Sequence, residues 1–179
     1  MLIRFLSLVA VTLGVVALAG AGHAADAAPA RDLTDARILG TLGAGDADQI
    51  EAAKLAATKA SAKDVRDYAK MMIHDHQESF ETNTKLAKRF RLSRTQPEDS
   101  AMAREHKQEM TQLNLLAGSA FDLAFLQAMV TDHAALIQNV KTTLLPAAQR
   151  NGVKAFIREL LPVLTGHQSM GQALLDKQK

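Results

Sequence analysis

The sequence contains no cysteine and no tryptophan, and a single tyrosine in 179 residues. The absence of cysteine excludes disulfide bonds, thiolate metal ligands, cysteine nucleophiles and anchoring through a lipidated cysteine. Because only six phenylalanines accompany the tyrosine, the core is expected to be aliphatic and built from Leu, Ala and Met. Without disulfides, that core alone must hold the folded chain together.

A strong excess of charge of one sign is also missing. The chain has 21 Lys and Arg against 19 Asp and Glu, which gives a net charge of +2. Domains that bind nucleic acid concentrate basic residues on one face, and no interleaving of basic and aromatic residues is present here. A glycine-rich phosphate loop is absent as well. We therefore expect no nucleic-acid partner.

The N-terminus resembles a secretory signal. Arg4 is the only charged residue before Asp26, and the apolar run 5–21 is 17 residues long. Small residues follow at 22–24, so we predict a signal peptide over 1–24, cleaved after Ala24. The alternative is an uncleaved membrane anchor. Cleavage would remove Arg4, leave 20 basic against 19 acidic groups, and place the protein in the periplasm. No later segment is expected to span a membrane.

Helix-forming residues dominate the rest of the chain. We expect a flexible N-terminal segment over 25–34 and one domain over 35–178. Signals at Gly, Pro and Ser residues divide this domain into five helices, at about 32–60, 61–92, 98–117, 119–148 and 153–176.

The boundaries of these helices rest on local signals. Ser61-Ala-Lys-Asp64 resembles a capping box, and Ser119 is expected to cap the fourth helix. Asn151-Gly152 is expected to form a turn. Pro162 lies within the last helix and should kink or break it.

The helix lengths predict a topology. The second helix is about 45 Å long, and the third helix, about 30 Å, plus its link spans a similar distance. The chain can therefore descend, return and descend again, which gives an all-α, ferritin-like four-helix bundle with a helical crossover. A simple up-and-down bundle of five helices is the alternative.

Three helices each place one histidine on their apolar stripe. In the second helix, the spacing of Val65, Ala69 and Met72 continues to His76, whereas His74 falls on the polar face. His133 and His167 occupy the same kind of position in the fourth and fifth helices. In the crossover topology all three lie at about the same height, so we expect them to meet near the middle of the bundle.

Such a cluster is a candidate metal site. Buried imidazoles without partners are costly, and three histidines with an open fourth position suit zinc. Thioethers beside imidazoles favour copper, and Met72, Met129 and Met170 each lie one turn from one of these histidines. The alternative is that the methionines only fill the core and the histidines form a hydrogen-bonded polar cluster.

The sequence offers fewer candidate carboxylate ligands than histidine ligands for this site. A di-iron bundle needs inward Glu-x-x-His pairs, and Ile73, Val130 and Leu164 stand three residues before the histidines, so zinc or copper is favoured over iron. Asp46 lies on an apolar stripe of the first helix and is an additional candidate. Asp75 and Asp132 precede two of the histidines and are expected to act as hydrogen-bond partners of ligands or in ion pairs.

A basic cluster closes the second helix. Its cations complement the helix dipole, and a peripheral contact with an anionic envelope membrane is the functional interpretation. The cluster consists of Lys85, Lys88, Arg89, Arg91 and Arg94.

Four motifs occur in order along the chain. They are I-x-x-x-K-L-A at 50–56, V-x-x-Y-A-x-x-M-x-x-D-H at 65–76, G-x-x-F-D at 118–122 followed by Asp132-His133, and L-P-x-L-x-x-H at 161–167. This set resembles the bacterial family of exported proteins catalogued as domain of unknown function 4142. The resemblance covers about residues 35–175 and implies a ferritin-like fold, export and outer-membrane association, with no established activity. The family often has Glu where this chain has Gln49, which makes Gln49 a further candidate near the site.

The sequence thus predicts an exported helical bundle that binds a metal ion at His76, His133 and His167 and buffers or senses it rather than catalysing a reaction. The alternative is an envelope or stress-related interaction scaffold without metal. A ferritin-type oxidase is disfavoured by the missing inward carboxylates.

Overall fold

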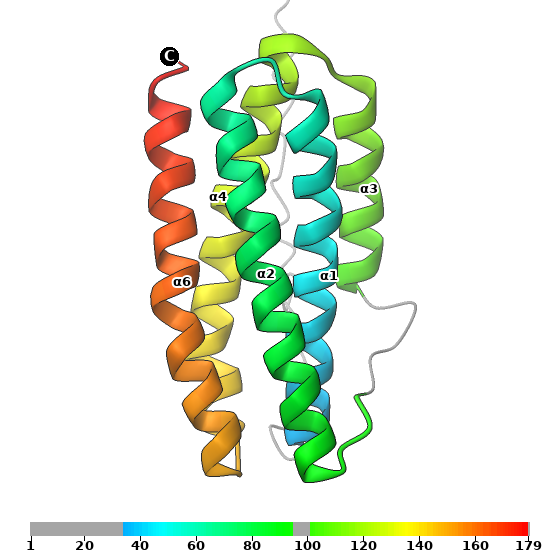
Figure 1. The fold of residues 1–179 in the computed structure, drawn as a ribbon, viewed down its shortest axis with the longest axis vertical. Coiled ribbons are helices and arrows are strands. Elements are labelled where there is room, and N and C mark those ends of the chain that lie inside the picture. The colour runs from blue at the N-terminus through cyan, green and yellow to red at the C-terminus, as the bar shows by residue number, and fades with distance from the viewer. Residues whose placement is uncertain (1–33, 95–100, 179) are drawn as a thin grey trace, which may run out of the picture.

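The structure is a computed structural model that describes residues 34–94 and 101–178, and these residues form helices without any strand (Figure 1). The predicted signal peptide, the segment up to residue 33, the link at 95–97 and the expected start of the third helix at 98 lie outside the described residues. The elements are α1 (Asp35–Lys59), α2 (Lys63–Phe90), α3 (Ala101–Leu115), α4 (Gly118–Asn139), the π-helical segment η2 (Val140–Leu144), α5 (Leu145–Ala147) and α6 (Asn151–Asp176).

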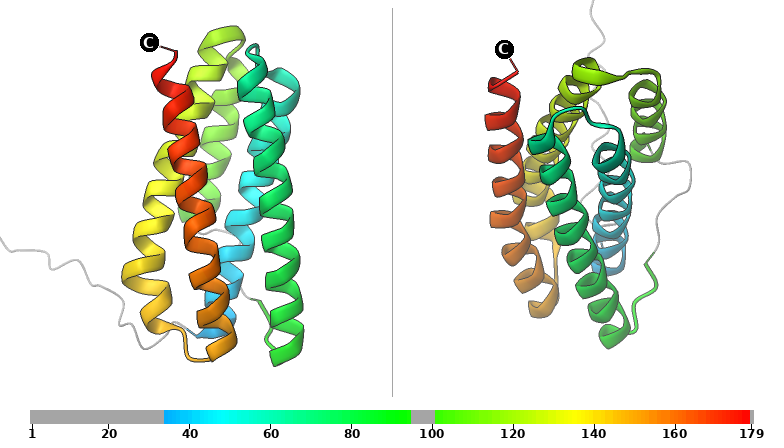
Figure 2. Two further views of the ribbon diagram at one scale, coloured as in Figure 1. Left: turned by 60° about the vertical axis from the view of Figure 1, so that its left-hand side comes forward. Right: turned by 45° about the horizontal axis from the view of Figure 1, so that its top comes forward.

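Four long helices form the bundle and α3 lies outside it. In Figure 1, α1 ascends, α2 descends, α3 climbs back beside α1, α4 descends and α6 ascends. Helices α2 and α4 are therefore parallel and are joined by a crossover, and the two further views agree (Figure 2). The predicted all-α bundle with a helical crossover is confirmed, and the five-helix up-and-down alternative is wrong.

The apolar core is divided into two clusters along the bundle axis. The upper cluster includes buried residues from 52–60 at the C-terminal end of α1, from 65–72 of α2 and from 121–129 of α4. The lower cluster includes buried residues from 38–42 of α1, from 137–148 and from 153–164 of α6. The buried side chains between them are polar, and they are Asp46, Gln49, His76, His133 and His167. The bundle therefore has a polar layer at mid-height where packing alone would place Leu or Ile.

Two buried aspartates hold the ends of the bundle. Asp122 of α4 accepts hydrogen bonds from the backbone N–H groups of Ser61 and Ala62, both at 2.8 Å, and from Ser61 Oγ at 2.6 Å. The expected capping box is therefore wrong: the N-cap of α2 is Ala62, and a distant carboxylate does the capping. At the opposite end, Asp35 accepts from the N–H groups of Gln149 (2.8 Å) and Arg150 (3.1 Å).

Replacing Asp122 with Ala should lower the free energy of unfolding by about 2–4 kcal/mol, because three donors in a part-buried turn lose their acceptor. Chemical denaturation followed by circular dichroism measures this change. The control is Asp67→Ala, which removes only exposed ion pairs and should change the free energy of unfolding little. Equal losses in the two variants would contradict the assigned role of Asp122.

At three other sequence signals for helix boundaries, the local structure differs from the prediction. Ser119 lies inside α4, whose N-cap is Ala117, and Gly118 takes the left-handed φ of 58° that favours glycine. Asn151 and Gly152 begin α6 instead of forming a turn, and a Cβ at Gly152 would lie 2.9 Å from the Phe90 ring. Helix α6 continues through Pro162 without a break, since that residue is exposed and the carbonyl that it leaves unpaired can bind water.

One helical stretch is longer and more apolar than was expected from the sequence for any segment after the N-terminal one. Among the described residues, the continuous helical stretch Gly118–Ala147 is long and apolar enough to cross a membrane by length and composition. The same stretch supplies Phe121, Phe125 and Met129 to the upper core cluster. Part of its apolar surface is therefore buried in the core of this bundle.

Candidate metal centre

The three predicted histidines meet in the polar layer. His76 comes from α2, His133 from α4 and His167 from α6, and each is at most 2% exposed. Their ring centroids are 5.2 to 5.7 Å apart, and one ring nitrogen of each lies within 4.8 Å of the others. The prediction that they lie together is confirmed. His74 points outward, with its side chain 76% exposed, as its helix position requires.

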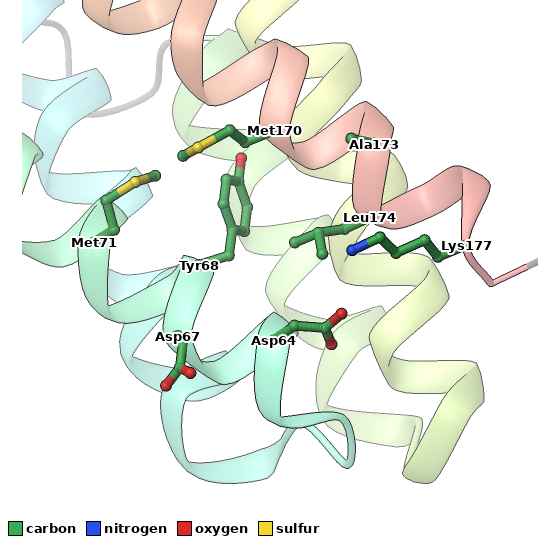
Figure 3. Close-up of a pocket in the computed structure, with 8 residues that line it drawn as sticks. All are labelled: Asp64, Asp67, Tyr68, Met71, Met170, Ala173, Leu174 and Lys177. Carbon is green, nitrogen blue, oxygen red and sulfur yellow. The ribbon is translucent and has the colours of Figure 1, made fainter.

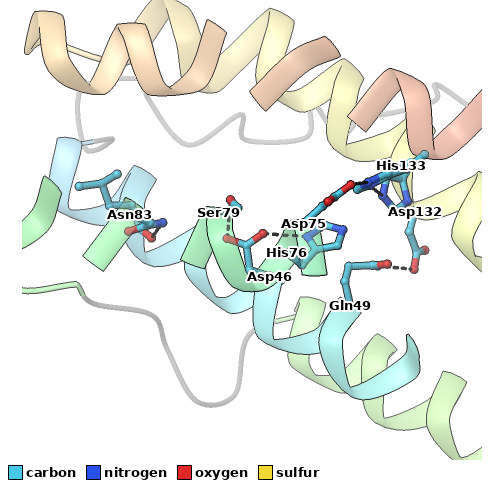
Figure 4. Close-up of polar contacts among 10 residues, drawn as sticks. Asp46, Gln49, Asp75, His76, Ser79, Asn83, Asp132 and His133 are labelled. Carbon is cyan, nitrogen blue, oxygen red and sulfur yellow. Dashed lines mark hydrogen bonds and ion pairs between the residues drawn. The ribbon is translucent and has the colours of Figure 1, made fainter. Parts of the chain in front are cut away.

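Each imidazole has one nitrogen in a hydrogen bond to oxygen. His133 Nδ1 donates to the Met129 carbonyl at 2.8 Å, His76 Nδ1 donates to Asp46 Oδ1 at 2.9 Å, and His167 Nε2 donates to Asp75 Oδ2 at 2.9 Å. Figure 4 shows the contacts of Asp46 and Asp75 in this layer. These partners fix the tautomer of each neutral ring, because the nitrogen that donates must carry the proton.

The remaining nitrogens then present lone pairs to one another. His76 Nε2 is buried and has no hydrogen-bond partner. His133 Nε2 and His167 Nδ1 are 3.3 Å apart, and both are acceptors when their other nitrogens donate. Three convergent acceptors without a donor are unfavourable in a buried site. A cation placed between them would remove this cost.

The protonation state of the cluster favours a metal over an extra proton. Burial lowers the pKa of His133 to about 3, with a smaller contribution from neighbouring His76. Burial also lowers the pKa of His167, against the opposing effect of its hydrogen bond to Asp75. Neutral imidazole is the form that binds metal ions, so at pH 7 both rings are ready to coordinate.

The two carboxylates act on the rings from the outer side. Asp46 is 4% exposed, and its second oxygen accepts from Ser79 Oγ at 2.9 Å. Asp75 also binds His74 at 3.0 Å. Carboxylate–histidine pairs of this kind orient ligands in metal sites and raise their basicity. The only sequence signal for Asp46 is its place on an apolar stripe, and the pattern contains no signal for the Met129 carbonyl.

The side chains of the other candidate residues make different contacts. The Nε2 group of Gln49 donates to Asp132 Oδ2 at 3.3 Å and does not hydrogen-bond the histidines. Met72 and Met129 are fully buried in the upper core cluster. Met170 is 42% exposed and lines a shallow groove between α2 and α6, beside Tyr68 (Figure 3). The structure therefore brings Asp46 to the cluster and does not bring Met170 to it.

The basic cluster is on the surface at the end of α2. Four of its members are exposed, and Arg94 is partly buried with its guanidinium 4.8 Å from the centre of the Phe80 ring. Contact with an anionic membrane stays a prediction for this cluster. Arg94 has a packing role there in addition to its charge.

The site can hold one cation through three imidazole nitrogens. Among the described residues, no other group of three His, Asp or Glu side chains has ligand atoms close enough to share an ion. Positions 73, 130 and 164 carry Ile, Val and Leu, so no carboxylate stands one turn before a histidine, as in di-iron bundles.

Comparison with curated proteins and with solved structures gave no match. A family described as "Domain of unknown function (DUF4142)" matches residues 19–174, which include every element of the bundle up to the last turn of α6. This match covers far more than half of the chain and agrees with the order of the sequence motifs. The protein therefore belongs to the DUF4142 family.

Proposed function

We propose that the protein binds one zinc or copper ion at His76, His133 and His167. The observation that carries this proposal is the convergence of three buried lone-pair nitrogens whose partner nitrogens are all hydrogen-bonded to oxygen. This is the arrangement in which imidazoles are oriented for a metal before it binds. The ion would supply the positive charge that the cluster lacks.

The spacing of the nitrogens supports the choice of ion. Ligands about 2.0–2.1 Å from a tetrahedral zinc lie roughly 3.3–3.4 Å from each other. His133 Nε2 and His167 Nδ1 are already 3.3 Å apart, and small movements of the His76 ring would complete the set. Imidazole ligands suit zinc and copper, whereas the absence of carboxylate ligands disfavours iron.

We also propose that the protein is exported and acts as a metal buffer or sensor in the periplasm. The apolar N-terminal segment with its single charge supports export. Three protein ligands would leave a fourth position open to water or to an incoming ligand. The burial of the site favours retention and release of an ion over turnover of a substrate.

Metal analysis of the untagged protein tests the proposal. After incubation with zinc or copper and removal of excess ion, we expect close to one ion per chain. Each of the variants His76→Ala, His133→Ala and His167→Ala should lose most of it, because two imidazoles hold an ion far more weakly than three. The measurement is inductively coupled plasma mass spectrometry with circular dichroism to check the fold.

The matched control is His74→Ala, which removes an exposed imidazole from the same helix and should leave the metal content unchanged. The proposal would be overturned if the wild-type protein binds neither zinc nor copper. The histidines would then be a structural polar layer, and a metal-independent interaction scaffold would be the better description.

A further inference from the structure

A second feature lies on the other side of α1, where α3 covers the bundle incompletely. A cavity of about 310 Å³ opens between α1, α3 and α4. Helix α3 buries only one residue, Leu113, close to its C-terminal end, where Lys59 Nζ donates to the carbonyls of residues 113 and 114. The size is that of a site for a small organic molecule.

One wall of the cavity is acidic. Asp48, Glu109 and Asp132 line it, and Glu109 is hydrogen-bonded to Asp132. Burial, with the charge of Asp132, raises the pKa of Glu109 to about 8. His106 is the one basic side chain on the wall among the described residues, and its Nε2 is 3.2 Å from Glu51. Above pH 8, where Glu109 is ionised, the wall therefore carries more negative charge than one imidazole can balance.

Two acceptor atoms in this region are buried without hydrogen bonds. They are Oε1 of Gln49, a lining residue that is 91% buried, and Oε1 of Glu109. Figure 4 shows the Gln49 side chain reaching Asp132. Unpaired buried acceptors are costly, so the site calls for a ligand that brings N–H or O–H donors.

The lining also has apolar side chains, among them Leu42, Met102 and Leu136, which we refer to as the apolar wall. Among the described residues, the cavity carboxylates do not form a group with ligand atoms close enough for one metal ion. A cation that fits must therefore spread its contacts over several ångströms and carry an apolar part. An alkylammonium ion has both properties and supplies three N–H donors.

We propose that this cavity binds a small aliphatic amine in its ammonium form. The ammonium group lies against Glu109, Asp132 and the Gln49 carbonyl oxygen. The carbon chain lies against the apolar wall. This site is separate from the histidine cluster and does not depend on a metal there.

Calorimetric titration of metal-free, untagged protein with 1-butylamine at pH 8.5 and low salt tests the inference. At this pH Glu109, whose pKa is about 8, is mostly ionised, and the amine is still an ammonium ion. We expect saturable binding of one molecule per chain. Glu109→Gln should weaken it at least about tenfold, because the variant keeps the shape of the side chain and loses a charge-assisted hydrogen bond. Glu78→Gln, the same change at an exposed position of α2, should leave the affinity unchanged.

Further controls separate this inference from the proposed metal site. His167→Ala should bind the amine as the wild type does, whatever its metal content. 1-Butanol, which has the same chain and no charge, should not bind. Absence of saturable heat, equal affinity of Glu109→Gln, or binding of manganese chloride without binding of the amine would overturn the inference. Circular dichroism verifies that each variant is folded.

Discussion

Zinc or copper is expected to raise the midpoint of thermal unfolding by roughly 12 to 16 °C when free ion exceeds its dissociation constant about a thousandfold. Preferential binding to the folded state at that ratio contributes about 4 kcal/mol. For a domain of this length, 1 kcal/mol corresponds to roughly 3–4 °C. The effect is large because the three ligands come from α2, α4 and α6, so the ion ties together helices that separate on unfolding.

The variants define what the shift depends on. His133→Ala should show almost none, and His74→Ala should show all of it. Asp46→Asn should show an intermediate shift, since loss of a carboxylate partner of a ligand weakens metal affinity about 10- to 100-fold. Differential scanning calorimetry at several metal concentrations provides the measurement. A shift of the same size in His133→Ala would place the ion elsewhere.

Acid should destabilise the metal-free protein through His133. Its pKa is about 3 in the folded state and about 6.5 in the unfolded chain, so the unfolded chain binds more protons between these values. The contribution of neutral His133 to the free energy of unfolding is fully present above pH 6.5 and is lost as the pH falls towards 3. The stability of the wild type relative to His133→Gln should therefore fall by up to about 1.4 kcal/mol per pH unit below 6.5.

Glu109 changes the stability with pH in the opposite direction to His133. The effect of His133 is therefore measured as the difference between the wild type and His133→Gln. Burial raises its folded pKa to about 8, so its contribution is present at acid pH and is lost as pH rises from about 4.5 to 8. The pH profile of the wild type alone mixes the two effects. Urea denaturation of wild type, His133→Gln and Glu109→Gln from pH 4 to 8 separates them. A pH-independent difference for His133→Gln would show that this ring is not held neutral by the fold.

Where the structure departs from the sequence predictions, the interaction is between elements far apart in the chain. Residues 61–64 resemble a capping box, with Asp64 in the place of Glu, yet Ser61 donates to Asp122, 61 residues away. Asn151-Gly152 has the composition of a turn, but Asp35 of α1 accepts from Arg150 N–H just before them and α6 begins there. Local signals could not reveal either partner, because each depends on how two helix ends approach each other.

The sequence by itself determined the helices, the inward histidines and their common height. A helix has a fixed rise and rotation per residue, so spacing alone separates His76 from His74 and sets the level of His133 and His167. Only the tertiary structure decided which acceptor each ring meets and where α3 leaves a cavity. Those outcomes depend on helix rotation, interhelical distance and side-chain reach, which change by ångströms while the hydrophobic pattern stays the same.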